Sequence, residues 1–195
     1  MEENKQKQTT KIYIKNMVCQ RCVMAVSSIL SDMHLNAMSV ELGEAVIEGH
    51  LTAGQRAALA GRLSAVGFEL LDDRRQQTIS RIKNAIIKLV HYRDNNTQLN
   101  LSSFLSSELL ADYSSLSKLF SEVEGKTIER CYMEQRVERV KELIKYDEMT
   151  LTQIALQMNY SSVAYLSSQF KAVTGMTPTQ FKRAGRNTRR PLDKI

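Results

Sequence analysis

The sequence predicts two domains, an α+β sandwich and an all-α domain with two helix-turn-helix units. The sandwich covers residues 10–72, the helical domain covers residues 76–184, and a basic tail covers residues 185–195. Three observations predict this division. Short alternating apolar segments interleave with helical segments in the first part, a helical pattern repeats itself in the second part, and the excess positive charge lies entirely in the second part.

Charge is divided unequally along the chain. Residues 1–72 carry 7 Lys/Arg and 8 Asp/Glu, a net −1, whereas residues 73–195 carry 20 Lys/Arg and 13 Asp/Glu, a net +7. A basic domain beside a nearly neutral one favours a polyanion as partner. A basic surface that is merely solvated is the alternative that charge alone leaves open.

The composition bounds the class of protein. With 43% hydrophobic and 25% charged residues, the chain is typical of a globular protein. No apolar run approaches the roughly 20 residues of a membrane-spanning helix, and the polar N-terminus lacks the core of a signal peptide, so we expect a cytoplasmic protein without a membrane partner. Three scattered histidines and the lack of a Gly-rich phosphate loop predict no enzymatic activity.

The elements of the first domain follow from periodicity. The pattern predicts strands at 11–15, 37–42, 45–48 and 68–71, helices at 21–33 and 53–66, and a hairpin turn at Gly43-Glu44. The resulting order is βαββαβ, which corresponds to a ferredoxin-like sandwich of one antiparallel sheet and two helices.

The chemistry of this domain lies where its first strand meets its first helix. Cys19 and Cys22 form a C-x-x-C there, and the start of a helix, together with Arg21, favours thiolate over thiol. Two convergent thiolates suit a soft cation of low coordination, above all Cu(I), with Zn(II) or Cd(II) less favoured. A dithiol redox switch and a site without ligand chemistry are the alternatives. Met17 is expected to pack inward beneath the loop.

The arrangement M-x-C-x-x-C at this junction of a βαββαβ unit resembles the heavy-metal-associated domain of copper chaperones and metal-pumping ATPases. The resemblance covers about residues 10–72 and rests on Met17, Cys19, Cys22 and the pair Gly67-Phe68. It implies that the two cysteines hold the metal ion. Asn16 departs from the family, which usually has Gly before the Met.

The second domain contains a duplicated unit. The pattern predicts helices at 76–93, 101–110, 114–123, 129–145, 151–158 and 162–173, with tight turns at 111–113 and 159–161. Phe120 and Phe170 correspond at an offset of 50 residues, and Gly125 and Gly175 follow each at the same distance. The two phenylalanines are predicted to lie in the core, and the two glycines are predicted to end helices.

This half resembles the AraC/XylS family of regulators over about residues 76–184. The resemblance rests on the string LTQIALQMNYSSVAYLSSQFKAVTGMTP at 151–178, in which Ile154-Ala155, Phe170-Lys171, Gly175 and Thr177-Pro178 match the family signature. It implies two recognition helices, held by the helix at 129–145, that enter successive major-groove segments on one face of double-stranded DNA. Leu110 departs from the family, where a small residue is usual.

Outward residues of the two recognition helices are the candidate DNA contacts. Ser114, Ser115, Lys118, Ser162, Ala164, Tyr165 and Ser168 are predicted to face bases, and Gln169 and Lys171 to face phosphates. The basic tail is expected either to add phosphate contacts or to be a disordered solubilising segment.

Together these features predict a cytoplasmic, sequence-specific transcriptional regulator that responds to a soft metal ion. The alternative is a DNA-binding regulator whose first domain is a protein-docking, dimerisation or thiol-redox module. The expected partners are double-stranded DNA and the metal ion, with a metal chaperone or RNA polymerase as further candidates. Two helix-turn-helix units in one chain allow either a monomer or a homodimer to bind DNA.

Overall fold

The structure, a computed structural model, describes residues 8–95, 97, 99–185 and 189–195. Contacts between residues divide the chain into two compact units, Met1–Asn84 and Ala85–Ile195. No helix within the described ranges is both long enough and apolar enough to span a membrane.

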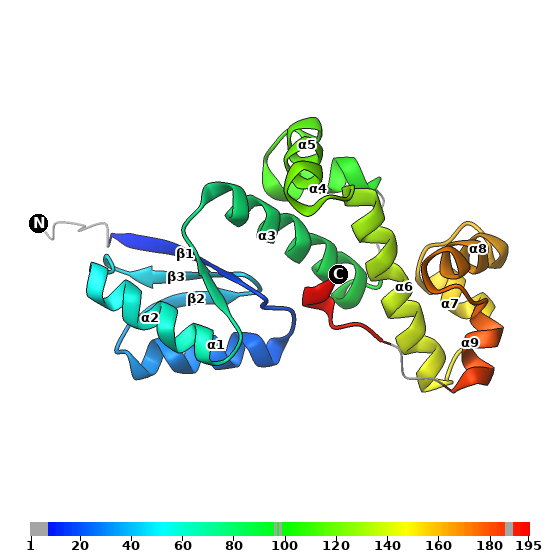
Figure 1. Cartoon of the computed structure of the whole chain (residues 1–195), viewed down its shortest axis with the longest axis horizontal. Helices are drawn as coiled ribbons and strands as arrows, with labels where there is room; N and C mark the ends of the chain where they lie inside the picture. Colours follow the sequence, from blue (N-terminus) through cyan, green and yellow to red (C-terminus); the bar gives the residue numbers. More distant parts are fainter. Residues whose placement is uncertain (1–7, 96, 98, 186–188) are drawn as a thin grey trace, which may run out of the picture. The chain divides into compact units, whose positions relative to one another are not determined.

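The first unit contains one antiparallel four-stranded sheet and two helices. The elements are β1 (Thr9–Lys15), α1 (Gln20–Asp32), β2 (Ala37–Glu41), β3 (Glu44–Glu48), α2 (Ala53–Ala65) and β4 (Glu69–Leu71), and the strand order is β2-β3-β1-β4. Both helices cover the same side of the sheet (Figure 1). The element order is the one that periodicity predicts.

Alternation along the strands explains the core of this unit. Ile12 and Ile14 are buried on β1, and Ala45, the cross-strand partner of Ile12, is buried on β3. The helices add Val26, Leu30, Leu59 and Leu63, all fully buried. Full burial of such side chains stabilises the unit by about 1.5–3 kcal/mol each.

The hairpin and the first helix of the helical region differ from their predictions. The β2–β3 turn is Leu42-Gly43, one residue earlier than predicted, and Gly43 has a φ of 85°. A Cβ atom on Gly43 would lie 1.7 Å from Nδ2 of Asn84, whose amide donates a hydrogen bond to the carbonyl of Leu42 (3.2 Å). Glycine therefore permits this approach of Asn84, which lies on α3 (Arg74–Ile87).

The boundary between the two units lies within α3, between Asn84 and Ala85, whereas the sequence places it at residues 72–75. The helix predicted at 76–93 is also not continuous. It ends at Ile87 and continues as a π-helical turn over Lys88–Tyr92, in which Leu89 and Val90 are buried.

The second unit is helical and is arranged around one long helix. The elements are α4 (Leu101–Leu109), α5 (Tyr113–Glu124), α6 (Ile128–Tyr146), α7 (Leu151–Gln157), α8 (Val163–Thr174), α9 (Pro178–Ala184) and a short 3₁₀ turn (Leu192–Lys194). Figure 1 shows α6 between the α4–α5 pair and the α7–α8 pair. This is the arrangement predicted for the helix at 129–145.

Helix α9 has no counterpart in the sequence analysis, although its start carries a clear signal. Thr177 accepts a hydrogen bond from the backbone N–H of Gln180, the Gln180 side chain accepts one from the backbone N–H of Thr177, and Pro178 occupies the first turn. A capping box followed by proline is a strong helix start.

Candidate nucleic-acid interface and thiol pair

The two predicted recognition helices, α5 and α8, bury equivalent side chains. Leu116 and Phe120 of α5 are buried, and Leu166 and Phe170 occupy the same positions of α8 at an offset of 50 residues. The core assignment of both phenylalanines is therefore confirmed. Burial of this stripe leaves the opposite face of each helix in solvent, which is the face that can enter a groove.

Each recognition helix begins with a side-chain cap, and the two caps differ in charge. Asp112 accepts a hydrogen bond from the backbone N–H of Ser115 (3.0 Å), and Ser162 accepts one from that of Tyr165 (3.0 Å). Hydrogen bonds from Ser114 and Ser115 hold the pKa of Asp112 below its ordinary value. The first helix-turn-helix unit therefore presents a carboxylate at the start of α5, and the second helix-turn-helix unit presents a neutral hydroxyl at the start of α8.

The predicted base-facing residues lie on the exposed surfaces of these helices. Exposed side chains are those of Ser114, Ser115, Lys118, Ser162, Ala164, Tyr165 and Ser168. Both Ser114 and Ser115 donate their hydroxyl hydrogens to Asp112. Their remaining capacity toward a base is therefore as acceptors.

The predicted phosphate contacts, Gln169 and Lys171, differ in exposure. Lys171 is exposed, whereas Gln169 is partly buried and donates from Nε2 to the hydroxyl of Tyr165 (2.8 Å). Oε1 of Gln169 is buried without a hydrogen-bond partner. Gln169 thus orients the Tyr165 ring, which also packs edge-on against Tyr160 at 6.1 Å.

The turn of the second helix-turn-helix unit is fastened to α6. Arg136, 7% exposed, donates to the carbonyl of Met158 (2.8 Å), and its guanidinium lies 3.7 Å from the centre of the Tyr160 ring. Asn95 donates to the same Met158 carbonyl (3.1 Å). Sequence analysis did not find either residue, because no local pattern distinguishes a buried Arg or Asn from an exposed one.

Cys19 and Cys22 lie together at the start of α1. Cys19 is the N-cap residue, and the two sulfurs are 3.4 Å apart. Burial alone would raise the pKa of the Cys19 thiol, but hydrogen bonds from Cys22 and Arg21 outweigh it and lower the pKa below its ordinary value. The geometry thus favours the thiolate form at an accessible pair of sulfurs.

The residues that flank the thiol loop fix its shape. Met17 is fully buried in the core, as predicted. The accessible sulfur donors of the loop are therefore those of the two cysteines. Asn16 has a φ of 72°, a conformation that glycine adopts readily and asparagine tolerates. Its amide donates to the carbonyl of Gly67 (2.9 Å), so the residue that departs from the family pattern ties the loop to the start of β4.

The donor set fits a soft ion of low coordination. Thiolate sulfurs bind zinc at about 2.3 Å, so two sulfurs 3.4 Å apart are both within reach of one ion placed between them. Among the described residues, no cluster of three or more His, Cys, Asp or Glu side chains occurs. Two thiolate sulfurs within reach of one ion are the kind of donor that soft metal ions prefer.

Comparisons with known proteins bear on the second unit. Residues 105–184 match the model of a family described as a helix-turn-helix domain. Two uncharacterized HTH-type transcriptional regulators of Staphylococcus aureus, from strains MSSA476 and MRSA252, are each 34% identical to this chain over 90 residues, which is 44% of this chain. The chain spans only 12% of the length of these relatives.

Two solved structures are also similar. One is a DNA-binding transcriptional dual regulator from Escherichia coli K-12, with 24% identity, coverage of 54% of this chain and 92% of that chain, and a TM-score of 0.47. The other is the C-terminal domain of AraT, a response regulator from Geobacillus stearothermophilus, with 24% identity, coverage of 57% and 88%, and a TM-score of 0.49. Residues 105–184 of this chain are thus similar to a helix-turn-helix domain.

Proposed function

We propose that this chain is a sequence-specific, DNA-binding transcriptional regulator of the AraC/XylS type, controlled by a soft metal ion on Cys19 and Cys22. Cu(I) is favoured, and Zn(II) and Cd(II) are the less favoured ions. The observation that carries the DNA-binding part is the pair of equivalent helices, α5 and α8, each with an apolar face buried against its unit and a polar face exposed. One long helix, α6, contacts both pairs.

The metal part of the proposal rests on the thiol pair. Two sulfurs 3.4 Å apart at a helix start, with the pKa of Cys19 lowered, are suited to a soft cation. The strand order β2-β3-β1-β4 with both helices on one side supports a ferredoxin-like fold of the heavy-metal-associated kind. A bound ion would join the two sulfurs through metal–sulfur bonds.

A second candidate function is thiol redox control at the same residues. The 3.4 Å separation also favours a Cys19–Cys22 disulfide, which forms when the two thiols give up two electrons and two protons to an oxidant. This candidate shares the site but requires oxidising conditions, so the experiment can separate the two.

The test is a DNA-binding titration of the full chain. An operator is first enriched from random duplexes, and affinity is then measured by fluorescence anisotropy at fixed salt, with and without buffered Cu(I) under reducing conditions. We expect one Cu(I) per chain and a change in affinity that is lost in Cys19→Ser and Cys22→Ser. Cys131→Ala is the matched control, because it removes a cysteine outside the loop.

The outcomes separate the parts of the proposal. No preferred operator would refute sequence-specific binding. Operator binding with no Cu(I) response in affinity or in transcription would refute metal control. A response that appears only after oxidation, and is lost in both Ser variants, would favour the disulfide.

A further inference from the structure

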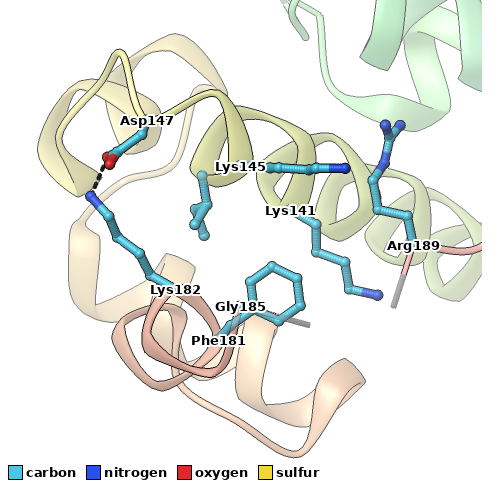
Figure 2. A pocket seen from close by; sticks show the side chains of 8 residues that line it. Lys141, Lys145, Asp147, Phe181, Lys182, Gly185 and Arg189 are labelled. Atoms are coloured by element: carbon cyan, nitrogen blue, oxygen red, sulfur yellow. Dashed lines mark hydrogen bonds and ion pairs between the residues drawn. The ribbon is translucent and has the colours of Figure 1, made fainter. Parts of the chain in front are cut away.

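A cavity of about 240 Å³ lies beside the C-terminal end of α6, against α9 (Figure 2). Its apolar wall is formed by Ile144 and Phe181, which are 5% and 7% exposed. The rest of the described lining consists of Gly185 and charged side chains, those of Lys141, Lys145, Asp147, Lys182 and Arg189. Four cations and one carboxylate thus surround an apolar wall.

The charges around the cavity do not balance. Three cations each have a carboxylate partner, in the pairs Lys141–Glu138 (2.7 Å), Lys182–Asp147 and Arg189–Glu142 (3.3 Å). Glu138 and Glu142 also pair with Arg190 and Arg139, respectively. Lys145 is exposed and has no ion pair with any residue that the structure describes. Within the described lining, cationic side chains outnumber carboxylates.

Charged side chains lie on both sides of the apolar wall. In Figure 2, the side chains of Lys141, Lys145 and Arg189 lie on one side of the Phe181 ring, and the Lys182–Asp147 pair lies on the other. Ligand sites commonly combine an apolar wall with a few convergent polar groups, and clustered ammonium and guanidinium groups are suited to an anion.

The size of the cavity limits the ligand. A cavity of about 150 Å³ accommodates benzene, and drug-sized ligands occupy pockets of about 300–1,000 Å³. At about 240 Å³, the cavity has room for one ring that carries an acidic group. A whole nucleotide is too large for it.

We propose that this cavity binds a small organic anion, with its apolar part on Ile144 and Phe181 and its anionic group between Lys141, Lys145 and Arg189. The site is separate from the thiol pair, and its existence does not depend on the proposed function. Phe181 packs edge-on against Phe170 of α8, with ring centres 5.4 Å apart. A ligand in the cavity would therefore contact Phe181, and Phe181 in turn contacts α8, the second predicted recognition helix.

The test uses phenyl phosphate as the probe and isothermal titration calorimetry on the full chain at low salt, without DNA. We expect saturable binding at one site per chain and a rise in the temperature of unfolding with phenyl phosphate concentration. Inorganic phosphate and benzyl alcohol each lack one half of the recognised chemistry, so both are expected to bind at least tenfold more weakly.

Lys145→Gln is the decisive variant, because Lys145 is exposed and its replacement breaks no ion pair of the described fold. We expect a five- to tenfold loss of phenyl phosphate affinity, the effect of one exposed charged contact. Lys15→Gln, in the first unit, removes the same charge from an exposed surface pair with Glu69 and should change nothing.

Three results would overturn the assignment. They are no saturable binding of phenyl phosphate, equal affinity for inorganic phosphate, and equal losses in Lys145→Gln and Lys15→Gln. The first result would show that the cavity does not bind phenyl phosphate. The second would show that the apolar wall does not contribute to binding, and the third would show that only the net charge of the protein matters. None of them bears on operator binding, which is measured separately.

Discussion

Leu110 ends α4 in a backbone conformation that most side chains avoid. Its φ of 52° and ψ of 46° are left-handed, and 92% of its side chain is exposed. The left-handed region costs a non-glycine residue about 1–2 kcal/mol, and the exposed side chain gains little from burial to offset that cost. In the second helix-turn-helix unit, the residue with this conformation in the equivalent turn is Asn159, and asparagine tolerates it better than leucine.

We therefore expect Leu110→Gly to raise the free energy of unfolding by about 0.5–1 kcal/mol, after the greater freedom of glycine in the unfolded chain is subtracted. Urea denaturation measures the change. Leu156, also exposed but within α7, is the matched position. Leu156→Gly should lower the free energy of unfolding, and a loss of stability in both variants would contradict the strain at Leu110.

His91 is the half-buried imidazole of the π-helical turn. Burial holds the pKa of His91 below its ordinary value, and Nε2 lies 2.9 Å from Oε1 of Gln135. The folded state therefore keeps the ring neutral, whereas the unfolded chain takes up a proton near pH 6.5, at about the ordinary histidine pKa. The stability contributed by this neutral ring is complete above that pH and is lost as the pH falls below it.

Between pH of about 7.5 and about 5.5, the free energy of unfolding should fall, and His91→Gln should flatten the fall. The slope from one histidine is at most about 1.4 kcal/mol per pH unit. Urea denaturation at a series of pH values measures it. An unchanged slope in His91→Gln would count against this assignment.

At the scale of elements, the two helix-turn-helix units share a geometry but not a charge. Residues 101–127 contain 2 Lys/Arg and 4 Asp/Glu, whereas residues 150–185 contain 3 Lys/Arg and no Asp/Glu. The caps show the same contrast, because Asp112 and Ser162 occupy equivalent positions at the start of α5 and α8. The second helix-turn-helix unit has the more positive net charge and is therefore the better match for DNA phosphates.

Exchange of the caps tests this asymmetry, because Asp and Ser both cap helices well and each variant should remain folded. Removal of the carboxylate in Asp112→Ser should strengthen operator binding about three- to fivefold, since the repulsion between two like charges about 4 Å apart in water is about 1 kcal/mol. Ser162→Asp should weaken it by a similar factor. Anisotropy titrations at one salt concentration measure both, and equal affinities would show that neither cap approaches the duplex.

At the scale of the whole molecule, the chain returns to α6 after the last helix. The backbone N–H of Arg190 donates to Glu138 (3.1 Å), Nε of Arg190 lies 3.3 Å from the same carboxylate, and Gln135 donates to the carbonyl of Leu192 (3.0 Å). Glu138 is fully buried. Arg189 and Arg190 belong to the basic tail, for which the sequence predicts either phosphate contacts or disorder. In the structure, both pair with carboxylates of α6.

Arg190→Met should lower the free energy of unfolding by about 1–2 kcal/mol. Loss of a partner from a buried charge costs about 3–5 kcal/mol, and the smaller value is expected because Lys141 remains on Glu138 and Arg190 is 43% exposed. The measurement is a double-mutant cycle with Glu138→Gln, in which the cost of Arg190→Met should shrink. Equal costs in both backgrounds would show that the pair is not coupled.

The sequence by itself determined the features that depend on neighbours within about four residues. Periodicity predicts the βαββαβ order and the buried stripes that include Phe120 and Phe170, because these follow from which face of a strand or helix is apolar. The exposed faces of α5 and α8 and the convergence of Cys19 and Cys22 follow from the same local rules.

Tertiary structure alone decided the features that join distant residues. The amide of Asn84 on α3 donates to the carbonyl of Leu42 in the β2–β3 turn, and the Asn95–Met158 bond spans 63 positions and fastens a turn to the helical core. The burial of Glu138 depends in the same way on Arg190, which is 52 positions away. A buried polar group is stable only where a partner reaches it, and periodicity contains no information on which distant residue that partner is.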